Sequence, residues 1–152
     1  MDSKTDAAED GEVAHLVELY DGDAAKIMAR IDAQLSILAS RAQTLLSLAG
    51  ITITVTGFSG ANIAKSGKLA SLSIVLGLVL VLLSAAVTMS GILRVEWTTR
   101  LGGRTLEQSI RAALGVRDQK TRSYSLALKL LIVGLALYVG SVGLLLAGAL
   151  TE

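Results

Sequence analysis

Residues that carry acid–base or metal chemistry are few in this chain and lie near its start. The single histidine, His15, stands in a segment that also holds six acidic residues between Glu9 and Asp23. Carboxylates bind calcium when their spacing forms a loop with a glycine at its sharp turn, and this spacing does not fit. We interpret His15 and the acids as solvated residues, and we predict neither a metal nor a cofactor.

A nucleophile with a base to activate it is also absent from the sequence. The tetrapeptide GFSG, from Gly57 to Gly60, places Ser59 between glycines, but no histidine or acid lies near it. The chain contains no cysteine, which excludes disulfides, thiolate catalysis and cysteine metal sites. No glycine-rich phosphate loop follows a strand. We therefore predict that the protein is not an enzyme.

The composition points to a membrane instead. Apolar residues make up 52% of the chain and charged residues only 18%, against about a quarter charged in a typical soluble domain. Three intervals, 42–64, 69–93 and 130–151, contain no charged residue. Each is longer than the roughly 20 residues that a helix needs to cross the hydrocarbon layer. The sequence predicts an all-α integral membrane protein with three transmembrane helices.

The spacing of apolar residues and glycines divides the chain into six parts. DGD, at 21–23, interrupts a first helical stripe, and a second stripe continues from Ile27 into the first uncharged interval. The expected parts are an acidic segment with a short helix (1–22), a long helix that is first cytoplasmic and then the first span (23–58), an external loop (59–68), a second span (69–93), a basic cytoplasmic connection with a short amphipathic helix (94–122) and a third span (123–150).

The sequence ITITVT, at 51–56, alternates as a β-strand does, but only over six residues. An isolated strand in lipid leaves its backbone groups without partners. The helical stripe that enters the segment therefore favours a helix, in which Thr52, Thr54 and Thr56 donate their hydroxyls to carbonyls one turn earlier.

The amphipathic helix predicted within 94–122 begins at TLEQ, 105–108, which fits a capping box. Its apolar face is Leu106, Ile110, Ala113 and Leu114, and we expect that face to lie either on the bilayer surface or on the long first helix. Trp97 and Tyr124 are expected interface anchors, because tryptophan and tyrosine settle at headgroup depth.

Lysines and arginines indicate the orientation. Ten near-membrane basic residues fall on the side of the N-terminus and the 94–122 connection, and two, Lys65 and Lys68, fall on the other side. The excess of basic residues marks the cytoplasmic side. We predict a bacterial inner-membrane protein with its N-terminus inside and its C-terminus outside.

Small residues recur every seven positions in two of the spans. Lipid-embedded helices associate at small residues, and a seven-residue repeat favours left-handed crossing. The second span has Ala70, Gly77, Ser84 and Gly91, and the third has Ala127, Gly134, Ser141 and Gly148. Gly50 and Gly57 are the expected matching face of the first span.

Basic residues at the span ends have two interpretations. Arg41, Arg94, Arg100 and Lys129 either reach headgroup phosphates or, in a homo-oligomer, surround a pore mouth. The seven basic residues from Arg94 to Arg122 lack interleaved aromatic residues, so we expect them to face anionic lipid rather than nucleic acid.

The segment SRAQTLLSLAG, at 40–50, resembles the start of the small membrane effector modules of bacterial nucleotide-signalled antiphage systems, the Pycsar-type and SLATT-type proteins. Arg41, Ala42, Leu45, Leu46 and Gly50 match the order of their first span, whereas Ala39 stands where those modules have an acid. The resemblance implies an oligomer that perturbs the membrane when a cytosolic partner triggers it. Two functions stay open: a self-associating, pore-forming or membrane-perturbing protein controlled through its cytoplasmic helices, or a non-conducting anchor that docks a partner.

Overall fold

The computed structural model describes residues 3–63, 68–93 and 105–149, and in these ranges every regular element is a helix. The elements are α1 (Ser3–Leu19), α2 (Ala24–Ile63), α3 (Lys68–Val87), a π-helical turn η1 (Thr88–Ile92) and α4 (Leu106–Ala149). Three of these helices contain stretches long and apolar enough to cross a membrane, in Ala24–Phe58, Ser71–Ile92 and Leu106–Gly143. The prediction of an all-α chain with three such helices is confirmed for this part of the chain.

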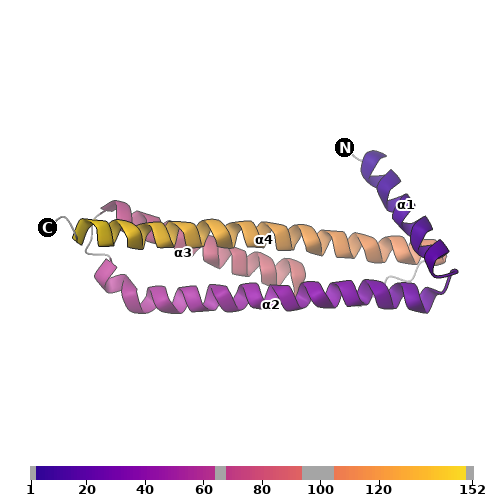
Figure 1. Ribbon diagram of the computed structural model, residues 1–152, viewed down its shortest axis with the longest axis horizontal. Coiled ribbons are helices and arrows are strands. Elements are labelled where there is room, and N and C mark those ends of the chain that lie inside the picture. Colours follow the sequence, from indigo (N-terminus) through magenta and orange to yellow (C-terminus); the bar gives the residue numbers. More distant parts are fainter. Residues whose placement is uncertain (1–2, 64–67, 94–104, 150–152) are drawn as a thin grey trace.

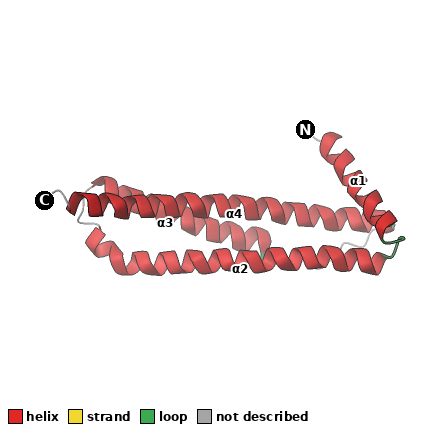
Figure 2. Cartoon of the chain, viewed as in Figure 1, coloured by secondary structure: helices red, strands yellow, loops and turns green. Residues whose placement is uncertain are grey.

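The helices form an elongated bundle rather than a compact one (Figure 1). The two longest helices, α2 and α4, run side by side in the same direction, α3 packs along one half of their length, and α1 lies across the opposite end. Figure 2 shows the same arrangement without any strand. The 40 residues of α2 span about 60 Å at 1.5 Å per residue. That length is about twice the hydrocarbon thickness of a bilayer.

The DGD sequence ends α1 and starts α2, as predicted. Asp21 and Gly22 have positive φ angles of 49° and 72°, the backbone conformation that commonly terminates a helix. Asp23 then caps α2, because its Oδ1 accepts hydrogen bonds from the amides of Ala25 at 3.0 Å and Lys26 at 3.2 Å. The reversal places α1 beside the first turns of α2.

The segment ITITVT is helical, as predicted, and its threonines bond within α2. The hydroxyl of Thr52 donates to the Leu48 carbonyl at 2.8 Å, and that of Thr56 to the Thr52 carbonyl at 2.7 Å. The predicted end of this helix at residue 58 is wrong, since α2 continues to Ile63. Glycine and serine weaken a helix by only about 1 kcal/mol or less each, and no proline is present to end it.

Two separate hydrophobic cores lie along the bundle. The core at the α1 end, hereafter the α1 core, joins three helices through Val13, Ile27, Ile31, Ile110, Ala113 and Leu114. The core at the other half, hereafter the α3 core, joins α2, α3 and α4 through Leu45, Ala49, Val81, Ala127 and Leu131. Both long helices therefore contribute to both cores.

The prediction of a short amphipathic helix separate from the third span is wrong. Helix α4 runs for 44 residues without a break from Leu106 to Ala149. The polar sequence RDQKTRSY, at 117–124, contains neither glycine nor proline, and polarity alone does not end a helix whose backbone bonds continue. Its first apolar face packs on α2 and α1, which decides between the two expected positions in favour of the long first helix.

The second span, predicted at 69–93, consists of α3 and η1. In η1 the amide of Leu93 donates to the Thr88 carbonyl at 3.2 Å, a bond across five residues. Thr88 and Ile92 are buried there. This π-helical turn was not predicted from the sequence.

Candidate functional site

An ionic junction holds α1, α2 and α4 together at the edge of the α1 core. The guanidinium of Arg117, on α4, makes two hydrogen bonds to the carboxylate of Glu12 on α1, with Nη1–Oε1 at 2.6 Å and Nη2–Oε2 at 3.0 Å. Its Nε donates to Asp118 Oδ1 at 2.9 Å, and Nη1 also lies 3.4 Å from Gln34 Oε1 on α2. We call this group the Arg117 junction.

Helical periodicity places Arg117 among apolar residues. Arg117 follows Ile110 and Leu114 by seven and three residues, so it lies on the apolar face of α4. Its side chain is only 19% exposed. The hydrogen bond from Arg117, opposed in part by burial, lowers the pKa of the Glu12 carboxyl. The same bond raises the pKa of the arginine, which is therefore always charged.

A second ion pair joins α1 to α4 but is open to solvent. Arg111 Nη2 lies 2.6 Å from Asp10 Oδ1, and the two side chains are 55% and 57% exposed. Exposed pairs of this kind contribute little to stability. The Arg117 junction is therefore the more specific polar contact of α1.

Two clefts lie on either side of the Arg117 junction, and Gln34 and Arg117 line both. The first, of about 250 Å³, faces α1 and includes His15, Tyr20 and Arg30. The second, of about 510 Å³, lies between α2 and α4 on the side of the α3 core, and we call it the lower cleft. Its remaining lining residues are Ile37, Leu38, Arg41, Thr121 and Tyr124.

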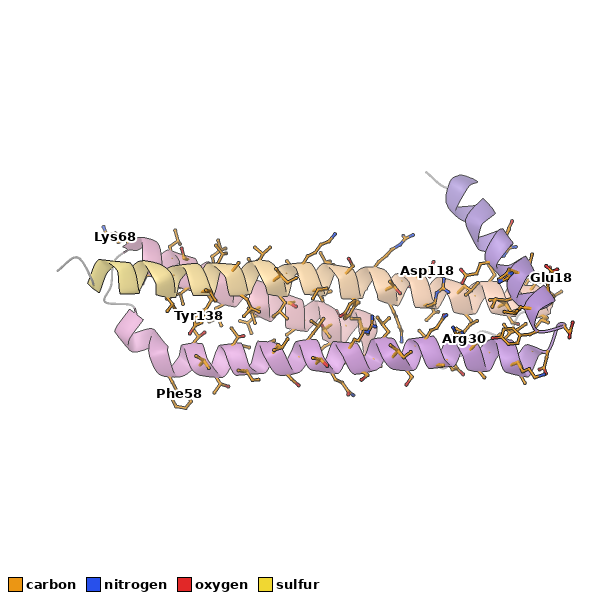
Figure 3. All side chains as sticks on the ribbon, viewed as in Figure 1. Glu18, Arg30, Phe58, Lys68, Asp118 and Tyr138 are labelled. Atoms are coloured by element: carbon orange, nitrogen blue, oxygen red, sulfur yellow. The ribbon has the colours of Figure 1, made fainter. Side chains whose placement is uncertain are left out.

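His15 is exposed, on the rim of the first cleft. Among the residues that the structure describes, no three histidine, cysteine, aspartate or glutamate side chains gather closely enough to hold a metal ion. Arg30, labelled in Figure 3, approaches this cleft from α2. The first cleft thus brings cationic and aromatic side chains together without a recognisable catalytic set.

The predicted boundary residues have different outcomes. Arg41 is exposed and Tyr124 is half-buried, and both line the lower cleft. Lys129 is exposed on α4. The other three predicted boundary residues, Arg94, Trp97 and Arg100, lie outside the described residues.

The structure brings the seven-residue repeats of the second and third spans together in antiparallel register. A methyl group added to Gly77 would lie 2.8 Å from the carbonyl oxygen of Gly134, and one added to Gly134 would lie 2.8 Å from that of Gly77. Seven residues along, the Ser84 hydroxyl donates to the Ala127 carbonyl at 2.7 Å. Backbones approach this closely only where side chains are small.

The outer positions of the same seven-residue repeats are Gly91 on the second span and Ser141 and Gly148 on the third. Gly91 lies against Ser123, whose side chain would be 2.6 Å from an added methyl group. Ser141 is buried on α4. Gly148 belongs to the last turns of α4, where only the backbone is described.

Gly50 and Gly57 do not form the predicted matching face within this chain. Both are exposed, and a methyl group added to either would meet nothing within 4 Å. The first span instead packs through Leu45, Ala49 and Thr52, which lie on another face of α2. For contacts inside the chain, the prediction for these two glycines is wrong.

The Arg117 junction was not predicted from the sequence. Its signal is a charged residue in phase with an apolar face, since Arg117 continues the series of Ile110, Ala113 and Leu114. Glu12 similarly precedes Val13 and Leu16 at the margin of the apolar face of α1. The sequence did not indicate which of the eight acids in the first 23 residues would pair with it.

Comparison of the chain with protein-family models, with curated proteins and with solved structures finds no match.

Proposed function

We propose that this chain is an integral membrane protein whose α3 half lies in the bilayer. Large apolar side chains cover the outside of this half, and in Figure 3 Phe58 points away from the other helices. The exposed fractions are 85% for Phe58, 65% for Leu72, 64% for Val139 and 61% for Ile51. So large an apolar surface is suited to lipid rather than to water.

In this arrangement the α1 core lies in the cytoplasm. Both long helices carry their charged residues toward the α1 end, where the Arg117 junction and the Arg111–Asp10 pair are found. The excess of lysine and arginine at this end supports its cytoplasmic position. The bacterial inner membrane is the location that we propose.

We infer that the protein self-associates through α2. The small residues Ser47, Gly50, Thr54 and Gly57 are exposed and recur at spacings of three, four and three. Exposed small residues at this spacing let two helix backbones approach closely in lipid. Gly50 and Gly57 thereby acquire a packing role between chains that they lack within one chain.

Control from the cytoplasm is the function that we propose for the α1 end. The observation that carries this proposal is the continuity of α2 and α4, each of which contributes to both cores without a break. A partner that displaces α1 would release the two long helices at one end and alter their packing at the other. The assembled protein would then perturb the membrane or open a pore.

The alternative is a non-conducting anchor that docks a partner through the α1 end. One observation favours it: in the described part of the chain, no buried side-chain polar atom lacks a hydrogen-bond partner. The hydroxyls of Thr52, Thr56 and Ser84 all bond to backbone carbonyls. In the described residues these hydroxyls are therefore used in the packing of the single chain, as an anchor requires.

The test combines assembly with leakage. The molar mass of the purified protein in detergent is measured by light scattering. The protein is then reconstituted in liposomes that contain a self-quenching dye. We expect an oligomer that releases dye, and we expect Gly50→Leu with Gly57→Leu to reduce both the mass and the release. Gly140→Leu is the matched control, because Gly140 is also exposed and its added side chain meets nothing within 4 Å.

The outcomes separate the proposals. Unchanged assembly in the double variant would show that this face of α2 is not an interface. A stable oligomer that leaves vesicles sealed, with and without α1, would favour the anchor. A chain that stays soluble in plain buffer would contradict the membrane location itself.

A further inference from the structure

The lower cleft marks the level at which the bundle is reduced to two helices. On one side, α3 and η1 end beside Ser123, which lies against Gly91. On the other side, the described contacts of α1 with α4 extend only as far as Arg117. Between these limits α2 and α4 face each other without a third described helix. The lower cleft of about 510 Å³ opens there.

The lining of the lower cleft combines apolar walls with one available cation. Ile37, 55% exposed, and Leu38 form the apolar part on α2. The charge of Arg117 is already balanced by Glu12 and Asp118. Arg41, by contrast, has no ion-pair partner among the described residues. Tyr124 lies across the cleft on α4, with its hydroxyl able to donate a hydrogen bond.

The position of the lower cleft relative to the apolar half indicates which class of ligand it binds. The uncharged interval of α2 begins at Ala42, directly after Arg41. In the membrane arrangement proposed above, on which this inference rests, Arg41 lies at headgroup depth. A cation and an aromatic hydroxyl at the edge of the apolar half match a phosphate attached to acyl chains, since basic pockets between membrane helices bind anionic headgroups.

We propose that the lower cleft binds the headgroup of an anionic phospholipid between α2 and α4. Arg41 pairs with the phosphate, Tyr124 donates to it, and the acyl chains follow the exposed apolar surface of α2 on the membrane side of Arg41, past Leu48 and Ile51. The open side of the cleft lets a lipid enter from the bilayer. A bound lipid would contact both α2 and α4 at the level where no third described helix packs against them.

The experiment measures lipid retention on the full chain. The protein in detergent is titrated with phosphatidylglycerol or with zwitterionic phosphatidylcholine, and bound lipid is counted by native mass spectrometry. We expect phosphatidylglycerol to be retained in preference to phosphatidylcholine. Arg41→Gln should weaken that retention about tenfold, because a charge-assisted bond to phosphate is lost. Tyr124→Phe should weaken it by a smaller factor.

Lys26→Gln is the matched control, because Lys26 is another exposed cation on α2 that does not line the cleft and lies near the α1 end. Equal retention of the two lipids, or an equal loss in both cation variants, would overturn the proposal. Displacement of the lipid by millimolar inorganic phosphate would also overturn it, in favour of a free-anion site. Lipid counting needs neither leakage nor assembly, so failure of the oligomer or of the pore leaves this result interpretable.

Discussion

Arg117 is a charged residue at a position where helix packing favours an apolar one. Burial of an arginine is unfavourable unless its donors find acceptors. Here Glu12 and Asp118 accept from three of its nitrogens, at 2.6, 3.0 and 2.9 Å. Because the partners come from different helices, removal of α1 takes away the carboxylate of Glu12. The junction therefore makes the docking of α1 specific as well as favourable.

The first prediction concerns the pH dependence of α1 docking. Arg117 lowers the pKa of Glu12 in the folded chain. The stabilisation of docked α1 by the Glu12–Arg117 pair is therefore complete above the ordinary glutamate pKa of about 4.3. It is lost as pH falls through the lower pKa that Glu12 has in the folded chain. Since Glu12 is 39% exposed, solvent screening reduces the effect to about 1 kcal/mol. We expect α1 to separate from α4 more readily below about pH 4.

The measurement is the distance between spin labels at Ala14→Cys on α1 and Gln119→Cys on α4. Both positions are exposed, and the chain has no other cysteine to label. Glu12→Gln is the control, because it keeps Asp10 and Asp118 but removes the titrating group. A pH response of the same size in Glu12→Gln would contradict the role of Glu12.

At the scale of helices, the contact of α3 with α4 depends on the absence of side chains. Gly77 and Gly134 face each other, and an added methyl group at either would lie 2.8 Å from a backbone oxygen of the partner. A backbone oxygen moves only when its helix moves. Alanine, the smallest possible addition, should therefore be enough to separate the two helices.

The second prediction is that Gly77→Ala and Gly134→Ala each destabilise the protein by about 1 to 3 kcal/mol, as overpacking does. Gly140→Ala should have the opposite sign, a gain of up to about 1 kcal/mol, because alanine favours a helix more than glycine does and meets no neighbour there. Thermal unfolding followed by circular dichroism in detergent measures both. A midpoint that falls equally in all three variants would contradict the close contact.

Sequence reasoning succeeded for features that depend on neighbouring residues along one helix. The break at DGD, the threonine bonds of α2 and the seven-residue repeat of α3 and α4 follow from fixed helical spacing. It failed where the outcome depends on partners far along the chain. The pairing of Glu12 with Arg117, 105 residues apart, and the exposure of Gly50 and Gly57 require the arrangement of whole helices.

Helix ends were the other source of error. The extension of α2 to Ile63 and the unbroken α4 both occur where polar or small residues predict a break. Such residues reduce helix stability by a fraction of a kcal/mol each. Packing of the adjacent apolar turns is enough to outweigh that cost.

At the scale of the whole molecule, two parallel helices of about 60 Å connect a charged end to an apolar half. Helix α3 is a return segment of 20 residues that lies along the apolar half alone. This arrangement places the N-terminal helix and the start of α4 at one end of the bundle, as Figure 1 shows. The bundle thus combines three helices long and apolar enough to span a membrane with a charged extension at one end.

The third prediction is that the two ends of the chain lie on opposite sides of the membrane. The candidate spans in α2, α3 and α4 would each take the chain across the membrane once, and three crossings would leave its two ends on opposite sides. The excess of basic residues at the α1 end then predicts a cytoplasmic N-terminus. Fluorescent and phosphatase tags fused to each end in bacterial cells measure this directly, because the first folds in the cytoplasm and the second is active only outside it. We expect fluorescence from the N-terminal fusion and phosphatase activity from the C-terminal fusion. Fluorescence from both fusions would mean that α4 does not cross, and the lower cleft would then lack its place at headgroup depth.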